Sequence, residues 1–286
     1  MAVYKRGYQR YQGPLTGPLA RLLVLPKFAW QRLMEQRLVV ILLVLSLFWP
    51  VACGLFVYLS NNAELLLGFG PEVLRLLKID GQFFVVFMNT QAVFAILLSA
   101  FAGPSLIAPD LANGALPLYF SRPLSRVEYV LARMIVLLGV LSPVTWIPGV
   151  LLFLMQSGLA GWPWFSENWR LGWAVFSGFL LWILLVSLVA MASSACVRWR
   201  MIAGGLVLGT FFVLAGAAEM AHLILRVEWV LALNPGRNMN QIWRWLLGAE
   251  AIPGPGAIAC LITTAVMAAA LLVVLERKLR PVEVVS

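Results

Sequence analysis

Few residues of this chain have the types and spacing that catalysis or metal binding requires. His222 is the only histidine, so an HExxH zinc site is excluded and a serine–histidine dyad would have to use this one side chain. The three cysteines, Cys53, Cys196 and Cys260, lie in or at the ends of apolar runs and form no CxxC pair, which is typical of small buried apolar residues. The sequence has no GxxxxGK(S/T) phosphate loop. We therefore expect no enzyme activity, metal or cofactor on this chain.

The most distinctive polar stretch is residues 103–133, GPSLIAPDLANGALPLYFSRPLSRVEYVLAR, which lies between two long apolar runs. Asp110 follows a proline and precedes a short apolar segment, so it is predicted to cap a short helix over residues 110–116. Gly114 and Pro117 limit that helix to one or two turns.

The end of this stretch predicts the start of a long helix. Ser125 and Glu128 stand three residues apart, as the N-cap and N3 residues of a capping box do. Nearby, Arg122, Arg126 and Arg133 are expected to reach lipid headgroups or acidic groups on a partner. The alternative is an ordinary helix–helix connection whose charges face water.

The composition of the whole chain indicates a membrane protein. Hydrophobic residues make up 62% of the 286 residues, charged residues only 12%, and the mean hydropathy is +0.91, whereas soluble domains carry about 25% charged residues. The net charge of +9 could suggest a nucleic-acid partner. We expect none, because the basic residues follow membrane topology.

Six apolar runs are long enough to cross a bilayer as helices. The fold class is therefore predicted as all-α, with a cytosolic tail and interfacial helix at 1–37, a transmembrane domain at 38–280 and a cytosolic tail at 281–286. Pro143 and Pro148 predict a kink or break in the third span. The predicted spans are residues 38–59, 82–102, 127–156, 171–197, 201–221 and 257–275.

Three segments outside the spans are amphipathic or aromatic. Residues 18–37 alternate apolar and basic side chains, which predicts a helix in the membrane interface that restarts at Pro26; packing on a partner is the alternative. Residues 161–173 hold four tryptophans and are predicted to be an interfacial loop. Residues 239–247 are predicted to form a short amphipathic surface helix.

The lysines and arginines set the orientation. With the N-terminal tail inside, the inner segments and the nearby starts of spans hold 15 of the 21 basic residues, and the outer segments hold 6. The positive-inside rule thus predicts cytoplasmic termini for a multi-pass protein, which we expect in a bacterial inner membrane.

The spans themselves carry only mild polar groups. No ionisable side chain lies in the middle of a span, where one would cost about 2.5–3.5 kcal/mol and would often mark ion coupling. Asn89, Gln91 and Thr210 are possible pathway-lining residues, with interhelical hydrogen bonding as the favoured alternative. Gly205 and Gly209 form a GxxxG pattern, which predicts dimer or helix packing.

Taken together, this topology and the polar stretch resemble the membrane subunits of ABC-2-type ABC transporters. The acidic position of that family corresponds to Asp110, its glycine step to Asn113, Gly114, Ala115 and Leu116, and its proline–serine–arginine step to Pro123, Ser125 and Arg126 within the sequence RPLSR that starts at Arg122. Asp stands here where Glu is usual, Ala115 where Thr is usual, and Pro117 interrupts the segment.

The resemblance implies an ATP-driven exporter in which the short helix is a coupling helix. It further implies two permease chains, as a homo- or heterodimer, and separate cytosolic ABC ATPase subunits that carry the ATP and Mg²⁺. Asp110–Leu116 would contact the ATPase, and Ser121–Glu128 would pass its movement to span 3. A different class of function remains open: a non-transporting membrane scaffold or assembly factor that binds a partner through its extracytoplasmic segment 222–256.

Overall fold

The computed structural model describes residues 18–62, 78–115 and 125–279, and side chains from residue 26 onward. Every regular element in these ranges is a helix, as the predicted fold class requires. The elements are α1 (Pro18–Met34), α2 (Arg37–Asn61), α4 (Gly81–Ala102), α5 (Pro104–Ala112), α7 (Arg126–Leu141), η2 (Ser142–Val144), α8 (Trp146–Ala160), α9 (Trp162–Cys196), α10 (Arg200–Leu225), η3 (Glu228–Leu233), α11 (Pro235–Leu247) and α12 (Ala257–Lys278).

Six helical stretches in the described residues are long and apolar enough to cross a membrane. Each overlaps one predicted span, so the multi-pass architecture is confirmed at this level. Two of them are composite, because α4 continues into α5 and α7 continues through η2 into α8. Their bounds are Arg37–Asn61, Gly81–Ala112, Arg126–Ala160, Trp162–Cys196, Arg200–Leu225 and Ala257–Lys278.

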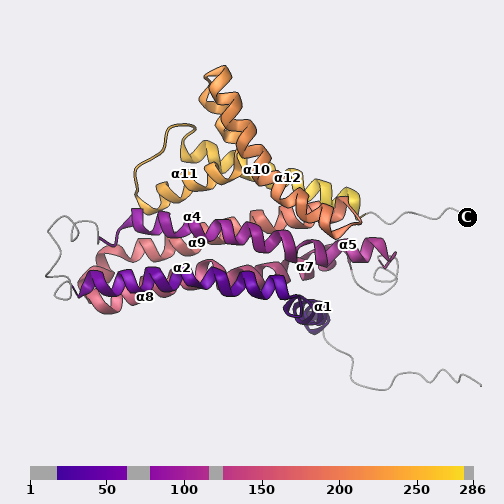
Figure 1. The fold of residues 1–286 in the computed structure, drawn as a ribbon, viewed down its shortest axis with the longest axis horizontal. Coiled ribbons are helices and arrows are strands. Elements are labelled where there is room, and N and C mark those ends of the chain that lie inside the picture. Colours follow the sequence, from indigo (N-terminus) through magenta and orange to yellow (C-terminus); the bar gives the residue numbers. More distant parts are fainter. Residues whose placement is uncertain (1–17, 63–77, 116–124, 280–286) are drawn as a thin grey trace, which may run out of the picture.

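The bundle is built around α9. Figure 1 shows α2, α4, α8 and α9 lying side by side, whereas α10 runs obliquely away from them. Helix α9 contacts α4, α5, α7, α8, α10, α11 and α12, and 72% of its most apolar stretch is buried. The corresponding shares for α2 and α12 are 17% and 11%. These outer helices expose apolar side chains, which suits contact with lipid.

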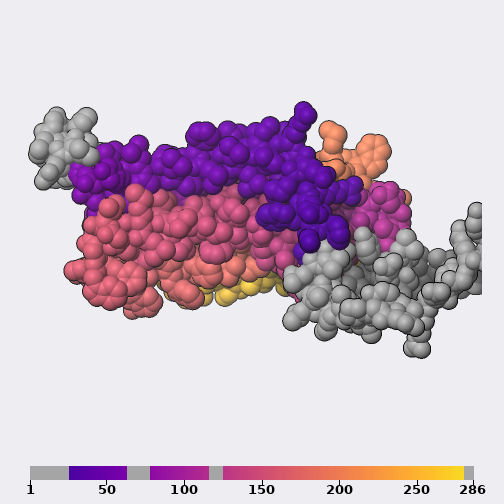
Figure 2. Space-filling view, turned by 90° about the horizontal axis from the view of Figure 1, so that it is seen from below, coloured from indigo at the N-terminus to yellow at the C-terminus, as the bar shows by residue number. Residues whose placement is uncertain are grey.

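Helix α2 and the helices of the third and fourth spans form adjacent layers. Figure 2 shows α2, in purple, along one side of the pink α7–α9 region. Two buried aromatic side chains mark the centre of the packing, since Trp182 and Trp243 are each 1% exposed and their ring centroids lie 5.8 Å apart in an edge-on arrangement.

The third span is broken, as its prolines predict. Helix α7 ends at Leu141, and one turn of 3-10 helix precedes α8. Pro143 lies in that turn. It interrupts the α-helix because proline has no backbone N–H to donate and its ring clashes with the preceding turn. Pro148 falls in the first turn of α8, where a missing donor costs nothing. Only the first of the two prolines therefore interrupts the span.

The predicted loop at residues 161–173 is wrong, because this segment is the start of α9. Gly161 ends α8 with a φ of +85°, and Pro163 stands in the first turn of the next helix. Ser166 and Asn168 bond back to carbonyls of that turn. With 35 residues, α9 is about 52 Å long, well beyond the roughly 30 Å hydrocarbon core. The tryptophans thus sit on a helix that extends past the core.

Two further helices depart from their predicted form. Helix α1 runs through Pro26 without the predicted restart; whether it lies in the membrane interface stays a prediction. The segment predicted as a surface helix from residue 239 begins at Pro235, where the Asn234 side chain accepts from the Arg237 amide at 3.1 Å. Helix α11 packs against α4, α9 and α12, so its apolar face belongs to the bundle interior.

Candidate coupling site between the second and third spans

Helix α5 continues the second span after a one-residue joint. Gly103 approaches α9 so closely that a Cβ on it would lie 2.6 Å from the Ala190 Cβ, so glycine is required there. Further along, the Ser194 hydroxyl of α9 accepts from the Ala108 amide at 2.9 Å and approaches the Pro104 carbonyl oxygen at 3.4 Å. These contacts hold α5 against the end of α9.

The predicted short helix at residues 110–116 is wrong in its position. Asp110 lies in the last turn of α5 and is not an N-cap, because helix formation already begins at Pro104 and ends at Ala112. Gly114 then takes a φ of +62°, a conformation that only glycine adopts without strain. The Ala115 amide bonds to the Asp110 carbonyl at 2.8 Å, which closes the helix end.

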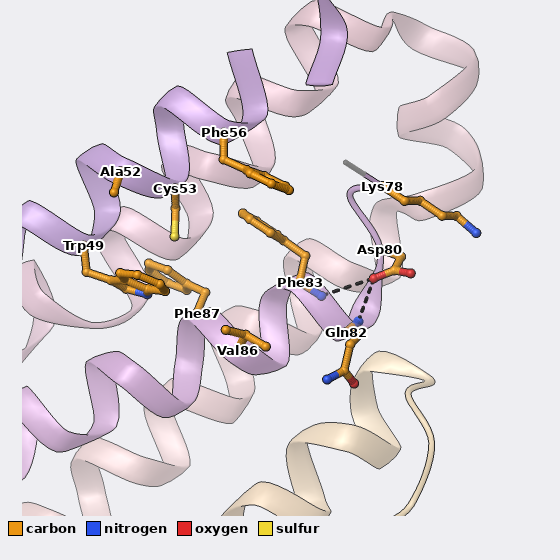
Figure 3. Close-up of a pocket in the computed structure, with 10 residues that line it drawn as sticks. All are labelled: Trp49, Ala52, Cys53, Phe56, Lys78, Asp80, Gln82, Phe83, Val86 and Phe87. Atoms are coloured by element: carbon orange, nitrogen blue, oxygen red, sulfur yellow. Dashed lines mark hydrogen bonds between the residues drawn. The ribbon is translucent and has the colours of Figure 1, made fainter. Parts of the chain in front are cut away.

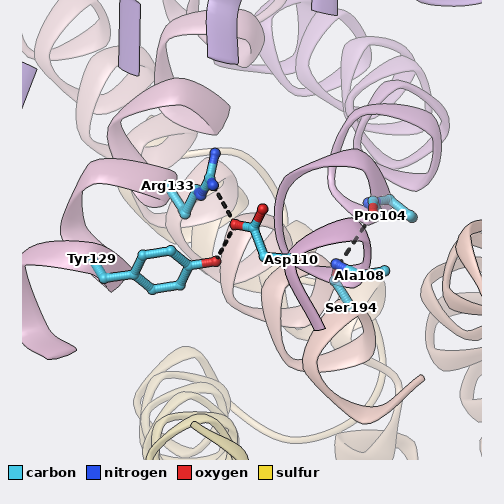
Figure 4. A network of polar contacts seen from close by, with 6 residues as sticks. All are labelled: Pro104, Ala108, Asp110, Tyr129, Arg133 and Ser194. Carbon is cyan, nitrogen blue, oxygen red and sulfur yellow. Dashed lines mark hydrogen bonds and ion pairs between the residues drawn. The ribbon is translucent and has the colours of Figure 1, made fainter. Parts of the chain in front are cut away.

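The carboxylate of Asp110 points at α7, as Figure 4 shows. One of its oxygens accepts a hydrogen bond from the Tyr129 hydroxyl at 2.7 Å and forms an ion pair with Arg133. The Arg133 guanidinium also lies over the Tyr129 ring, 5.2 Å from its centroid. We call these three residues, Asp110, Tyr129 and Arg133, the clamp. It joins the end of the second span to the start of the third.

The clamp overturns one sequence expectation. Arg133 was expected to reach lipid headgroups or a partner, but its side chain is only 9% exposed and Asp110 only 17%. Burial of a guanidinium is costly unless a carboxylate compensates it, so the pair holds α5 and α7 in one arrangement. Tyr129 and Arg133 are four residues apart and therefore share one helix face; this spacing was the signal in the sequence.

The capping box that the sequence predicts is confirmed. The Ser125 hydroxyl accepts from the Glu128 amide at 3.2 Å, and the Glu128 carboxylate accepts from the Ser125 amide at 2.7 Å. Both bonds satisfy donors that the first helical turn leaves open. Helix α7 therefore has a fixed starting point at Arg126, one turn before Tyr129.

The remaining predicted coupling residues divide into two groups. Asn113, Gly114, Ser125 and Arg126 are exposed and flank the segment 116–124 on its two sides. Leu116, Arg122 and Pro123 fall within that segment and so lie outside the described residues. The exposed flanks and the buried clamp are thus adjacent in the chain but differ in what they contact.

Helix α1 closes the other side of the clamp. A small cavity of about 150 Å³ lies between α1, α5 and α7 and is lined by Arg32, Gln36, Ser105, Asp110 and Arg133 among others. Helix α1 packs mainly against α7, and Leu33 is 1% exposed. The amphipathic helix therefore contacts the same two elements that the clamp joins.

The polar residues inside the spans mostly tie helices together. The Gln91 side chain donates to the Ser46 carbonyl of α2 at 3.0 Å and is fully buried. Asn89 accepts from Asn240 of α11 at 2.6 Å, whereas Thr210 bonds within its own helix, to Leu206. For Asn89 and Gln91 this is the interhelical bonding that the sequence favoured. A pathway-lining role for these three residues stays a prediction.

The glycines of α10 differ in what surrounds them. A Cβ on Gly204 would lie 2.6 Å from the Ala100 carbonyl oxygen of α4, but a Cβ on Gly205 or Gly209 would meet nothing within 4 Å. Close packing within the chain is therefore made by Gly204, which the GxxxG pattern did not single out. Whether Gly205 and Gly209 pack against another chain stays a prediction.

An apolar groove opens at the opposite end of α2 and α4. It has a volume of about 560 Å³ and is lined by aromatic side chains, including Trp49, Phe56, Phe83 and Phe87 (Figure 3). Phe56 and Phe83 stack with centroids 5.6 Å apart. Asp80 at its mouth accepts from the Gln82 and Phe83 amides, and so caps α4.

The part of the chain that the structure describes has few side chains arranged for catalysis or metal binding. No group of three or more metal-ligating side chains occurs there. His222 is half-buried in the last turn of α10, where its Nδ1 lies 3.2 Å from the Val227 carbonyl oxygen. Arg133 is the one ionisable residue among the buried polar side chains of these ranges.

No model of a known protein family matches the chain, and no curated protein matches it either.

Proposed function

We propose that this chain is the membrane-spanning subunit of an ATP-driven transporter of the ABC-2 type, in which a separate cytosolic ATPase acts on the segment between the second and third spans. The six membrane-length helices and the resemblance of residues 103–133 to that class support the proposal. In this function the chain exports its substrate, works as a pair of permease chains and leaves ATP and Mg²⁺ to its partner.

One observation carries the proposal. The segment 116–124 is bracketed by the clamp, in which Asp110 bonds Tyr129 and Arg133, and by the capping box of Ser125 and Glu128. Both devices attach the segment to rigid helices within one or two turns of its ends. A force applied to the exposed flanks would therefore act on α5 and α7 together, through the clamp and the capping box.

Orientation supports the same assignment. With six crossings, both termini lie on one side, and the positive-inside rule makes that side the cytosol. The segment between the second and third spans is then also cytosolic, where an ATPase can reach it. The break at Pro143 would let α7 tilt without requiring α8 to follow.

The scaffold alternative has less free surface to act through. Its segment 222–256 contains α11, whose residues Met239, Ile242 and Trp243 are at most 1% exposed. Trp229 and Trp245 remain exposed, at 69% and 59%. An outer partner would have to bind those flanking residues while leaving the buried face of α11 in place.

The test is purification of the tagged full chain from its native membranes in mild detergent, followed by identification of any subunit that carries GxxxxGK(S/T). We expect such an ATPase to co-purify with the native chain and to be lost with Arg126→Glu. Arg126 is exposed and lies in the first turn of α7, where a carboxylate suits the helix dipole. The substitution thus changes the docking surface without weakening the helix.

Arg170→Glu is the matched control, because Arg170 is also an exposed helical arginine but lies on the opposite membrane side in the proposed topology. It should leave the ATPase bound. A chain that purifies without an ATPase, or one whose ATPase is released equally by both substitutions, would contradict the proposed coupling.

A further inference from the structure

A second groove lies at the end of the bundle where α2 and α10 begin and α4 ends. It has a volume of about 640 Å³, within the range of small-molecule sites. Three helices form it, with the α4–α5 joint as its third wall. Its lining residues are Gln36, Arg37, Leu38, Ala100, Phe101, Pro104, Arg200, Met201, Gly204, Gly205 and Leu208.

The charge of this groove is all of one sign. Arg37 and Arg200 both line it and are both exposed, and its lining includes no Asp or Glu. The Arg200 guanidinium donates to the Gln36 side-chain oxygen at 3.0 Å, which bridges the start of α10 to the residue before α2. The Arg200 guanidinium is thus held in place by Gln36, and the exposed Arg37 lines the same groove. Two guanidinium-bearing side chains at one groove suit a phosphate.

The rest of the groove is apolar and open. Leu38, Phe101 and Met201 are 58%, 40% and 90% exposed, which is costly in water but not against hydrocarbon. Its floor is made by adjacent glycines, of which Gly204 packs on the Ala100 carbonyl and Gly205 faces empty space. The missing side chain at Gly205 leaves room for another molecule to lie along α10.

The positive rim and the apolar wall of the groove are arranged like the headgroup and the acyl chains of a phospholipid. Arg37 and Arg200 are the first residues of α2 and α10, so the positive rim is at the level where membrane-length helices start. The apolar wall then continues along those helices toward the bilayer centre. Basic pockets between transmembrane helices on the cytoplasmic side favour anionic lipid headgroups.

We propose that this groove binds one anionic phospholipid of the inner leaflet, with its phosphate on Arg37 and Arg200 and an acyl chain against Gly205, Leu38 and Phe101. The lipid would fill the space between the first, second and fifth spans. This site is independent of ATPase docking, because the exposed flanks of segment 116–124 do not line it.

The test measures how many lipids the purified full chain retains by native mass spectrometry, with phosphatidylglycerol as the probe and phosphatidylcholine of the same acyl chains as the comparison. The native chain should retain one phosphatidylglycerol molecule in preference to phosphatidylcholine. Arg37→Gln/Arg200→Gln should weaken that retention roughly 30-fold, which corresponds to the loss of two cations near a membrane surface. Arg277→Gln/Lys278→Gln, which removes two exposed cations from the end of α12, should not.

Gly205→Leu tests the acyl-chain half of the site without touching the charges. It should abolish the preferred lipid, whereas Gly209→Leu should not, because both glycines face open space but only Gly205 lines the groove. Both variants should melt at or slightly above the native temperature, because leucine has a higher helix propensity than glycine and neither position is crowded. Equal phosphatidylglycerol retention in Gly205→Leu and Gly209→Leu would overturn the proposal. So would a dimer that Gly205→Leu dissociates while the lipid stays bound, since a second copy would then occupy the groove.

Discussion

The hydroxyl of Tyr129 donates to the carboxylate of Asp110 at 2.7 Å, which joins two helices at the point where the second span ends and the third begins. The same carboxylate pairs with Arg133 one turn further on. Helix α5 is itself fixed to α9 by Ser194. If α7 moves relative to α9, either the bonds of the clamp break or α5 moves together with α7.

Removal of the clamp charge should destabilise the bundle. Asp110→Asn removes the carboxylate charge that pairs with the buried Arg133 guanidinium, so we expect a loss of about 3 kcal/mol, the lower end for a broken buried pair because Asp110 is partly exposed. Tyr129→Phe removes only the hydroxyl and should cost less, about 1.5 kcal/mol. Thermal unfolding in detergent measures both. Equal melting temperatures for the native chain and Asp110→Asn would show that the pair contributes nothing.

The capping box should control fraying of the third span at its start. Ser125→Ala removes the acceptor for the Glu128 amide, at a cost of about 1 kcal/mol to that helix end. Hydrogen exchange should accelerate at the first amides of α7 and stay unchanged in α8, which the Pro143 break separates. Ser125→Thr keeps a hydroxyl and is the control. Hydrogen exchange as fast in Ser125→Thr as in Ser125→Ala would argue against the cap.

Adjacent glycines in α10 should respond in opposite directions to the same change. Gly204→Ala places a Cβ 2.6 Å from the Ala100 carbonyl oxygen, so we expect a loss of about 1–3 kcal/mol from overpacking. Gly205→Ala meets open space and should stabilise the helix by about 0.5–1 kcal/mol. Melting temperatures of the two variants should lie on either side of the native value, and a shift of the same sign in both would contradict the packing described.

Two tryptophans of α11 should likewise behave differently. Trp243 is 1% exposed and donates to the Gly178 carbonyl at 3.0 Å, whereas Trp245 is 59% exposed. Trp243→Ala should cost about 3–5 kcal/mol and lower the yield of folded protein, while Trp245→Ala should be nearly neutral for stability. Size-exclusion profiles and melting curves distinguish them. A surface position for α11 would instead make both substitutions mild.

The predicted orientation can be checked with reporter fusions after Leu59, Ala102 and Gln156. A reporter active only outside the cytoplasm should give signal after the first and third positions and none after the second. A cytoplasmic reporter should give the reverse pattern and so serves as the control. External signal after Ala102 would place residues 103–133 out of reach of a cytosolic ATPase and contradict the proposed coupling.

The span positions followed from composition, because bilayer crossing requires a length of apolar sequence that few other structures need. The break near Pro143 and the capping box at Ser125 were also accessible, since proline and the Ser–Glu spacing act through the local backbone. The start of α9 was not. Its density of tryptophans favours a loop at the membrane interface, although Pro163 is a helix-start signal.

The contacts that position the candidate site depend on residues far apart in the chain. Asp110 and Arg133 are 23 residues apart, and no local pattern says that their helices lie side by side. Without that contact, Asp110 looked like a cap and Arg133 like an exposed cation. The buried face of α11 was missed for the same reason, because amphipathicity alone does not tell whether the apolar side meets lipid or protein.

The burial of α11 has a consequence for biosynthesis. This helix lies between the fifth and sixth spans in the chain, yet Trp243 and Asn240 bond to α9 and α4. Helices α4 and α9 are made first and therefore lack these two partners until α11 (Pro235–Leu247) has been synthesised. Chains that end before Leu247 would lack both bonds, so we expect quality-control proteases to recognise them.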